Sequence, residues 1–237
     1  MQSKRARLDR FVSVRTGINR RHIRPLLAQG RLIVDGSPAT AIHQLIDEFT
    51  HVALDGCVLQ ANKPIYLMMN KPMGVVSATR DDRHKTVIDL LDRPDRENLH
   101  IVGRLDFNSS GLILLTNDGR WSRHLTSPAQ KIPKVYHVTL ANPMTDEYVE
   151  AFAKGLYFSF ENITTRPAKL KILDDFTAEV TLIEGRYHQI KRMFGRFQNP
   201  VLSLHRSAIG NLQLDVGLAP GESRELEEGE VSYFNQQ

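Results

Sequence analysis

The stretch GRLDFNSSGLILLT, residues 103–116, places one carboxylate beside an arginine, just before a polar turn and a strongly apolar run. Side chains alternate between the two faces of a strand, so an extended segment 102–106 would put Arg104 and Asp106 on one face and turn Leu105 into the core. A carboxylate where a rigid strand meets a loop is well placed for chemistry, as a nucleophile or a base. An aspartate before a turn can equally serve only to cap that turn.

A second carboxylate that could act together with Asp106 is not evident. A glycosidase also breaks a bond at a sugar C1′ atom, but it normally needs two carboxylates. Glu184 is the one candidate partner in the motifs, and the sequence EGR around it is more typical of a turn before a helix. His188 lies in RYHQIKRMFGRF, and we interpret it as a packed or hydrogen-bonded helix histidine rather than an acid–base catalyst.

The composition is that of an ordinary globular protein. The chain has 237 residues, enough for one large or two ordinary domains, and 41% of them are hydrophobic. Cys57 is the only cysteine, which excludes an intrachain disulfide and a Cys/His zinc cluster. No apolar run approaches the length of a membrane span, and no secretory signal follows Met1. We therefore expect an intracellular protein that needs no metal and no redox cofactor.

The basic residues are concentrated at the start of the chain. Residues 1–31 contain nine basic residues and one acidic residue, a net charge of +8. The remainder contains 22 basic and 26 acidic residues, a net charge of −4. This asymmetry favours a polyanion-binding module attached to a more neutral body, although a solvated basic helix face would also account for it.

The first 62 residues predict two helices followed by short strands. RLDRFVSVRTG is the first helix and ends at Gly17, and NRRHIRPLLAQG is the second, with Asn19 as N-cap. Pro25 should kink the second helix or delay its start. RLIVDG, HVALDG and CVLQ predict strands that turn at Asp-Gly pairs, and ANKP at 61–64 reads as a linker.

The rest of the chain predicts many strands and three helices. The expected strands are IYLMMNKP, VVSAT, NLHIVGRLD, GLILLTNDG closed by a turn at Asp118-Gly119, KVYHVTL, AKLKILDD, FTAEVTLIEG, VLSLHRSAIG and LQLDVG. The expected helices are TVIDLL, TDEYVEAFAKG and RYHQIKRMFGRF. LAPGESRELEEGEV reads as a turn, a short strand and a solvated acidic tail.

The first segment resembles the S4 RNA-binding domain, in RLDRFV followed by NRRHIRPLLAQGRLIVDG. Paired helices in that family present basic side chains to structured RNA. The resemblance implies that four arginines of this chain bind RNA, namely Arg20, Arg21, Arg24 and Arg31. Phosphate contacts of this kind add affinity but little sequence information. The family commonly has serine at the position of Asn19, and Pro25 departs from its pattern.

The motif GRLDFNSSGLILLTNDG resembles the signature loop of the pseudouridine synthases, in the branch named after the small-subunit rRNA enzyme RsuA. Three further stretches agree with that family: NKPMGVV, KVYHVTL and EGRYHQIKRMF. With the S4-like segment, the resemblance covers essentially the whole chain. Asn108 and the two serines after it replace the Asp-Thr-Thr of some relatives.

The resemblance also implies the site residues. Asp106 would be the essential catalytic residue, acting without a metal or another cofactor. Tyr136 matches the aromatic residue that stacks on a flipped-out base. Lys191 matches the cation that is paired with the aspartate. Arg104 matches the arginine that contacts RNA near the flipped-out nucleotide. Leu204 would add an apolar wall below the base. By residue type alone, Tyr136 fits an ordinary strand tyrosine as well as a stacking residue. Lys191 fits a solvated lysine on a basic helix better than a partner of the aspartate.

A synthase of this family breaks the N1–C1′ bond of a uridine, rotates the uracil and joins C5 to C1′. DGRWSRHLTSP, EGRYHQIKRMF and LHRSAIG are most similar to the small-subunit enzyme, which implies 16S rRNA as substrate, either naked or in a ribosomal-protein-bound assembly intermediate. Two alternatives stay open: a synthase that acts on 23S rRNA or tRNA, and a non-catalytic ribosome-associated RNA-binding protein. A pure binder has no need of Asp106, Tyr136 and Lys191 together.

We therefore expect an α+β fold in two domains. A small S4-like RNA-binding domain of helices and strands would span residues 1–61. A catalytic domain would span 62–237, with a mixed, mostly antiparallel sheet flanked by helices. The expected protein is a cytoplasmic monomer that does not bind membranes.

Overall fold

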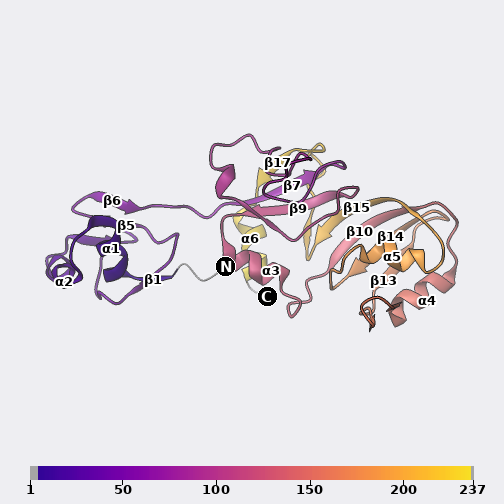
Figure 1. Cartoon of the computed structure of the whole chain (residues 1–237), viewed down its shortest axis with the longest axis horizontal. Helices are drawn as coiled ribbons and strands as arrows, with labels where there is room; N and C mark the ends of the chain where they lie inside the picture. Colours follow the sequence, from indigo (N-terminus) through magenta and orange to yellow (C-terminus); the bar gives the residue numbers. More distant parts are fainter. Residues whose placement is uncertain (1–4, 236–237) are drawn as a thin grey trace. The chain divides into compact units, whose positions relative to one another are not determined.

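The computed structural model describes residues 5–235, and the chain divides into two compact units, residues 1–64 and 65–237 (Figure 1). Each unit has its own hydrophobic core, since the first unit buries one cluster of apolar side chains and the second unit buries separate clusters. No helix within residues 5–235 is long and apolar enough to cross a membrane.

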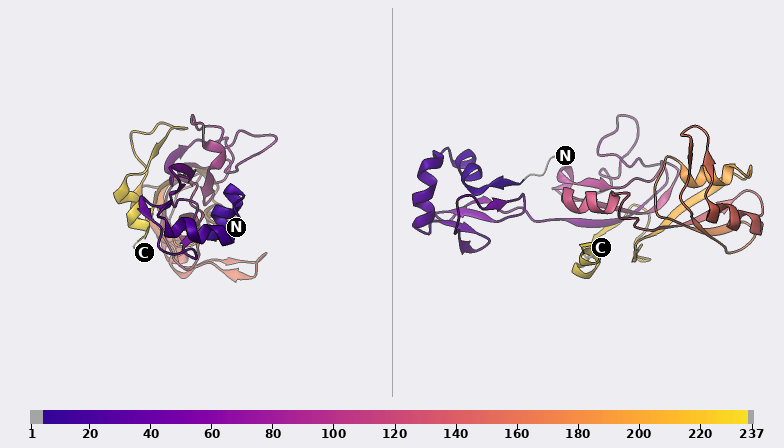
Figure 2. Two further views of the ribbon diagram at one scale, coloured as in Figure 1. Left: turned by 90° about the vertical axis from the view of Figure 1, so that its left-hand side faces the viewer. Right: turned by 90° about the horizontal axis from the view of Figure 1, so that it is seen from below.

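The first unit packs two helices against short antiparallel strands (Figure 2). Its elements are β1 (Ala6–Arg7), α1 (Leu8–Thr16), α2 (Arg20–Ala28), β2 (Leu32–Val34), β3 (Ser37–Pro38), β4 (Leu45–Ile46), β5 (Val52–Leu54) and β6 (Cys57–Gln60). Strands β3, β2, β5 and β6 form one sheet in that order, and β1 pairs with β4. Leu8, Val12 and Ile23 of the helices are fully buried together with Leu32 and Val52 of the sheet.

The second helix begins where the sequence predicts, in spite of its proline. The Asn19 side chain accepts a hydrogen bond from the backbone N–H of Arg21, which confirms the predicted N-cap. The α2 helix starts at Arg20 and continues through Pro25, so the expectation of a later start is wrong. Pro25 removes one helical hydrogen bond, but the residue is exposed, so water can replace that bond.

The second unit is built on one large mixed sheet. Its elements are β7 (Tyr66–Lys71), the 3₁₀ helix η1 (Arg96–Asn98), β8 (His100–Val102), β9 (Ser110–Thr116), α3 (Gly119–Thr126), β10 (Lys134–Leu140), α4 (Asp146–Lys154), β11 (Tyr157–Phe158), β12 (Ile163–Thr164), β13 (Lys169–Ile172), β14 (Thr177–Leu182), α5 (Gln189–Gly195), β15 (Val201–Ile209), β16 (Leu212–Gln213), β17 (Ser223–Glu225) and α6 (Glu228–Asn235). The main strand order is β13-β14-β10-β15-β9-β7-β17, with β8 beside β9 and β16 beside β15. The pair β15–β9 is parallel and the other pairs of this sheet are antiparallel. The predicted α+β fold is therefore confirmed.

The apolar run of the opening motif forms β9, which is buried on both faces. Leu112 and Leu114 pack into one cluster with Trp121, while Ile113 and Leu115 pack into another. A strand covered on both faces needs no polar alternation, which explains the continuous run. The residues just before β9 are thereby attached to the most buried part of the unit.

Several stretches of the second unit differ from the sequence prediction. VVSAT does not form a strand, and among residues 75–79 only Val76 pairs, in an isolated bridge. Residues 87–90 form turns instead of a short helix. Thr86 pairs with Val76 in an isolated parallel bridge, and the hydrogen bonds between Thr86 and Asp89 are those of a helix start that does not continue. Asp118 caps a helix that the sequence analysis does not predict. Its carboxylate accepts hydrogen bonds from the backbone N–H groups of Arg120 and Trp121, and α3 follows.

The C-terminal stretch is also more ordered than a solvated acidic tail. Helix α6 includes Phe234, which is fully buried, and Glu230 accepts two hydrogen bonds from Arg224. The basic helix expected over 186–197 is shorter, because α5 begins at Gln189. The residues that precede it form a loop, and this loop contributes to the site described next.

Candidate active site

The second unit contains a pocket of about 710 Å³. Arg104, Asp106, Tyr136 and Leu204, four of the residues that the sequence analysis singles out, line this pocket. The fifth, Lys191, reaches the same place, with its ammonium group 3.9 Å from the Asp106 carboxylate. The structure thus brings together side chains from one loop, two strands and a helix that are far apart in the sequence.

The loop that carries Asp106 is not the end of a strand. Strand β8 stops at Val102, and Gly103 has a φ of +75°, which glycine adopts at little cost. The predicted extended path through the motif is therefore wrong, because the chain turns before it reaches Arg104. Leu105 is nevertheless buried as expected, and the arginine and the aspartate both line the pocket.

Lys71 anchors the backbone of the Asp106 loop. Its side chain is fully buried, and its ammonium group donates to the backbone carbonyls of Pro72, Asp106 and Ser109 at 3.0, 3.1 and 2.8 Å. Burial lowers the pKa of Lys71 to about 8, although the nearby Asp106 carboxylate opposes this shift. Lys71 is in the motif NKPMGVV, to which the sequence analysis assigns no residue role.

Two basic side chains approach the same oxygen of Asp106. His188 Nε2 lies 3.5 Å and Lys191 Nζ 3.9 Å from Oδ2. His188 is packed as expected, because its ring stacks on Tyr187, but its expected place within a helix is wrong, since it precedes α5 with a φ of +47°. The Asp106 carboxylate is one-third exposed and can therefore meet a ligand in the pocket.

Two paired strands form the inner wall of the pocket. Tyr136 of β10 is directly opposite Arg206 of β15, and Val138 is opposite Leu204. Residues paired across antiparallel strands lie on the same face of the sheet. The Tyr136 ring, the Leu204 side chain and the Arg206 guanidinium are therefore neighbours on the pocket side, and all three are buried. An aromatic and an aliphatic side chain together suit a flat, apolar ligand face.

Arg206 connects this wall to the Asp106 loop. Its Nε atom donates to the carbonyl of Leu112 on β9 at 2.8 Å, and its Nη1 atom makes a longer contact of 3.4 Å with the carbonyl of Arg104. Gly111 allows β9 and β15 to approach closely, because a Cβ atom there would lie 2.3 Å from the Arg206 carbonyl oxygen. The sequence analysis quotes LHRSAIG without singling out this arginine.

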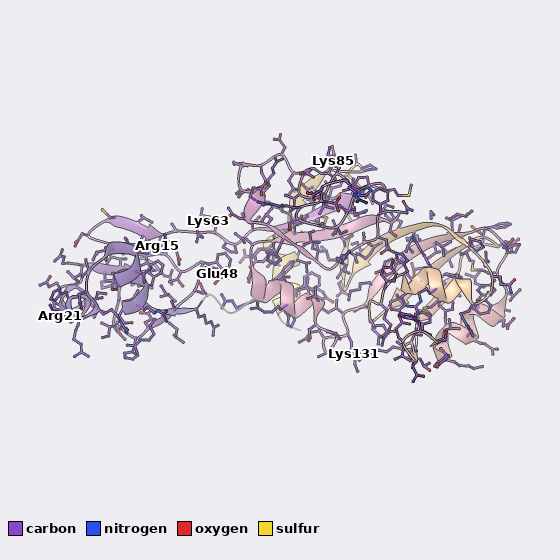
Figure 3. All side chains as sticks on the ribbon, viewed as in Figure 1. Arg15, Arg21, Glu48, Lys63, Lys85 and Lys131 are labelled. Atoms are coloured by element: carbon purple, nitrogen blue, oxygen red, sulfur yellow. The ribbon has the colours of Figure 1, made fainter. Side chains whose placement is uncertain are left out.

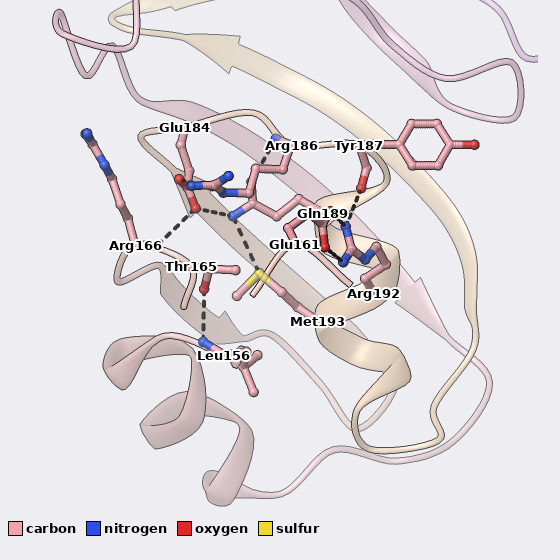
Figure 4. Close-up of polar contacts among 10 residues, drawn as sticks. All are labelled: Leu156, Glu161, Thr165, Arg166, Glu184, Arg186, Tyr187, Gln189, Arg192 and Met193. Carbon is pink, nitrogen blue, oxygen red and sulfur yellow. Dashed lines mark hydrogen bonds and ion pairs between the residues drawn. The ribbon is translucent and has the colours of Figure 1, made fainter. Parts of the chain in front are cut away.

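Glu184 is a structural carboxylate and not a second catalytic one (Figure 4). One oxygen accepts from the backbone N–H of Arg166 at 2.9 Å and from Gln189 Nε2 at 2.8 Å. The other oxygen accepts from Arg186 Nε at 3.2 Å. Three donors therefore occupy Glu184, which supports the interpretation of EGR as a turn before a helix. This arrangement argues against a glycosidase mechanism with paired carboxylates.

The four arginines predicted to bind RNA lie in the first unit, in two different settings. Arg20 donates to the buried carboxylate of Asp9 at 2.7 Å, and Arg31 forms two 2.6 Å hydrogen bonds with Asp55. Arg21 and Arg24 are exposed, and no carboxylate among residues 5–235 pairs with either; Figure 3 shows Arg21 at the surface of this unit. Arg21 and Arg24 are thus the more available pair.

No group of three or more His, Cys, Asp or Glu side chains in the described part of the chain could hold a metal ion. The site residues that sequence reasoning missed are His188 as a neighbour of Asp106, together with Lys71 and Arg206. The left-handed conformation of His188 and the buried positions of the two cations depend on tertiary packing. The motifs NKP and LHRSAIG were the only sequence signals for the two cations.

Comparison with known proteins gives one consistent result. Residues 65–195 match the RNA pseudouridylate synthase family. The chain is 50% identical over 226 residues to the ribosomal small subunit pseudouridine synthase A of Pseudomonas aeruginosa, covering 95% of this chain and 98% of that protein. It is 43% identical over 228 residues to the protein of the same name from Escherichia coli strain K12, with the same coverage. A crystal structure of a pseudouridylate synthase superimposes with a TM-score of 0.71 at 38% identity, covering 96% of this chain and 99% of that one.

Proposed function

Since this chain belongs to the RNA pseudouridylate synthase family, we propose that it isomerises a uridine of small-subunit ribosomal RNA, with Asp106 as the catalytic residue. The observation that carries the proposal is the Asp106 carboxylate in a pocket of about 710 Å³, with Lys191 and His188 beside one of its oxygens. Such a carboxylate can act as a nucleophile or a base, and the Lys191 ammonium group beside it can orient it.

The reaction rearranges bonds within one nucleoside. The N1–C1′ bond breaks, the uracil turns, and C5 bonds to C1′. The proton on C5 leaves and N1 gains a proton, so the atoms balance without a further reactant. The task of the protein is to hold the detached base in place, shield it from water and supply one carboxylate.

The pocket walls suit a base that has left its stack. Flipping a nucleotide out of RNA costs a few kcal/mol, and stacking on an aromatic side chain recovers part of that cost. Tyr136 is placed to stack on the uracil, and Leu204 to contact it from the same sheet face. Arg104 lines the pocket next to Asp106 and is assigned to the RNA strand near the flipped nucleotide.

The substrate assignment rests on the relatives. Two proteins named ribosomal small subunit pseudouridine synthase A match 95% of this chain at 50% and 43% identity. We assign 16S rRNA as the substrate, naked or bound to ribosomal proteins, and a cytoplasmic monomer as the active form. The first unit is assigned as an S4-like RNA-binding domain, in which Arg21 and Arg24 contact phosphates and Arg20 and Arg31 support them.

The test is to map pseudouridine in RNA treated with the protein. Transcripts of 16S and 23S rRNA, free or with ribosomal proteins, are incubated with the protein, modified with a carbodiimide that marks pseudouridine, and read by primer extension. A new stop in 16S rRNA alone is the expected result. A stop in 23S rRNA alone would replace the substrate and keep the chemistry, and RNA binding without any stop would support a non-catalytic binder.

A further inference from the structure

We propose that Arg166 and Arg186 form a phosphate-binding rim at the Asp106 pocket and hold the RNA backbone next to the target uridine. Both side chains line the pocket, and neither belongs to the residues assigned above to catalysis or base contact. The inference rests on the proposed function and adds to it a binding site for one part of the substrate.

Arg166 is a cation without a partner. Its Nη1 atom is buried and makes no hydrogen bond, and no carboxylate among residues 5–235 pairs with the side chain. In Figure 4 its guanidinium group extends away from Glu184, which accepts only the backbone N–H. A buried donor left unsatisfied costs about 1–3 kcal/mol, and more when it is charged. A ligand oxygen in the pocket would remove this cost.

The protein fixes the backbone of Arg166 firmly. Its N–H is bound by Glu184, which also binds Arg186 and Gln189, so one carboxylate sets the positions of both rim arginines. The β11–β12 hairpin that precedes Arg166 is fastened to α5 through Arg192. This side chain pairs with Glu161 and lies 3.8 Å from the centre of the Phe158 ring. The rim is therefore preorganised and does not depend on a flexible loop.

The charge of the pocket indicates which part of the substrate the rim binds. Two carboxylates line the pocket, and five arginine or lysine side chains do so, namely Arg104, Lys134, Arg166, Arg186 and Arg206. Glu184 is occupied by three donors, and Asp106 has Lys191 and His188 beside it. Uracil is neutral and does not call for this positive excess, whereas the phosphates on either side of a flipped nucleotide do. The planar fork of arginine matches phosphate oxygens well.

The experiment compares full-length wild type with Arg166→Gln over a range of KCl concentrations. The readout is pseudouridine formation in the RNA on which the wild type is active. We expect kcat/KM to fall about tenfold, the loss that corresponds to about 1.4 kcal/mol, with kcat at saturating RNA nearly unchanged. The dependence of log kcat/KM on log salt should become shallower by about 0.7, the value for one lost contact to single-stranded phosphate.

Arg196→Gln is the matched control. Arg196 is exposed, follows α5 in the same unit and does not line the pocket. Its substitution therefore removes one positive charge, as Arg166→Gln does, but from a position outside the pocket. Its kcat/KM and salt dependence should stay close to those of the wild type. Arg166→Lys, which keeps the charge, should recover most of the salt dependence. Thermal melting of Arg166→Gln should occur at a temperature no lower than that of the wild type, since the Glu184 contact uses only the backbone N–H.

Methylphosphonate substitution locates the phosphate. A neutral methylphosphonate on one side of the target uridine should reduce the wild-type kcat/KM to the level of Arg166→Gln and leave the variant unaffected. Equal losses for both proteins at every position would overturn the inference, as would an unchanged salt dependence or a clear loss of thermal stability in the variant. If the wild type forms no pseudouridine in any RNA, the proposed activity is contradicted instead. That result differs from the outcomes above, which contradict only the phosphate-binding rim.

Discussion

Asp106 is held at both its backbone and its side chain. Lys71 donates to its backbone carbonyl, and Lys191 and His188 lie beside one carboxylate oxygen. The carboxylate is one-third exposed, so a ligand in the pocket can reach it. Asp106 is thus contacted by residues from two further motifs, NKPMGVV and EGRYHQIKRMF.

Lys191 should matter for turnover more than for binding. Replacing it with methionine removes a cation 3.9 Å from the carboxylate, so we expect kcat to fall about 100-fold while the affinity for RNA changes little. Single-turnover rates and filter binding measure the two effects. Lys191→Arg is the control that retains the charge. Turnover of Lys191→Met at the wild-type rate would show that the ion pair has no role in the reaction.

Lys71 should make stability depend on pH in the alkaline range. Its pKa is about 8 in the folded protein and 10.5 for an ordinary lysine, so between these values the unfolded chain binds more protons. The free energy of unfolding contributed by this group should therefore rise with pH from about 8 to about 10.5. Urea unfolding at pH 7.5 and 9.5 tests this, as a difference between the wild type and Lys71→Met. A difference that does not change with pH would contradict the assigned pKa.

The sequence predicts which residues lie in the pocket better than it predicts the backbone conformation and strand pairing that place them there. Asp106, Tyr136 and Lys191 belong to motifs that a family resemblance identifies. The contact between His188 and Asp106 requires a φ of +47° at a non-glycine residue, which no local pattern indicates. Arg206 is a core arginine, and its importance appears only when β15 is placed beside β9.

Among the elements, the parallel pair of β9 and β15 connects the Asp106 loop to the wall formed by Tyr136 and Leu204. His205 and Arg206 are opposite Ser110 and Gly111 in this pair. The strands approach so closely that a side chain at Gly111 would overlap the Arg206 backbone. The distance between the catalytic loop and the wall of Tyr136 and Leu204 therefore depends on this glycine.

Gly111→Ala should destabilise the protein by more than about 2 kcal/mol. The new Cβ would lie 2.3 Å from a backbone oxygen, and alanine would have to adopt a φ of +103°. Gly119→Ala is the control, since its Cβ would meet only Arg123 Nη1 at 3.6 Å, and we expect a change within about 0.5 kcal/mol. Urea unfolding gives both values, and equal stability of the two variants would contradict the close approach.

The sequence predicts strands correctly where burial sets the pattern of apolar residues. It is less accurate where polar side chains form hydrogen bonds with the nearby backbone. The strands around β7, β9, β10 and β14 follow from apolar runs or alternation. Asp118-Gly119 reads as a turn, yet Asp118 begins a helix by capping it. Thr86 and Asp89 exchange the hydrogen bonds of a helix start, yet only turns follow them, and Thr86 pairs instead with Val76 in an isolated bridge.

Over the whole chain, the basic charge and the candidate catalytic pocket lie in different units. Residues 1–31 carry a net charge of +8, and the pocket lies wholly within residues 65–237. The buried cluster around Leu8 and Leu32 belongs to the first unit, and the clusters around Tyr136, Leu112 and Ile113 belong to the second. The basic excess and the pocket can therefore be separated by deleting the first unit.

Deletion of residues 1–61 should weaken RNA binding without unfolding the rest. The second unit keeps all of its buried clusters, so cooperative thermal melting should persist. The affinity for RNA should fall, and its dependence on salt should become shallower, because phosphate contacts are lost. Filter binding at several salt concentrations and differential scanning calorimetry measure the two properties. Loss of cooperative melting would contradict the independence of the two units.

The most direct test of the central claim is tritium release from RNA labelled at C5 of uridine. Forming the C5–C1′ bond expels the C5 hydrogen, so release reports the isomerisation itself and not RNA binding. We predict that the wild type releases tritium from 16S rRNA, and that Asp106→Asn binds the RNA equally well and releases none. Release by the variant at the wild-type rate would show that Asp106 is not the catalytic residue.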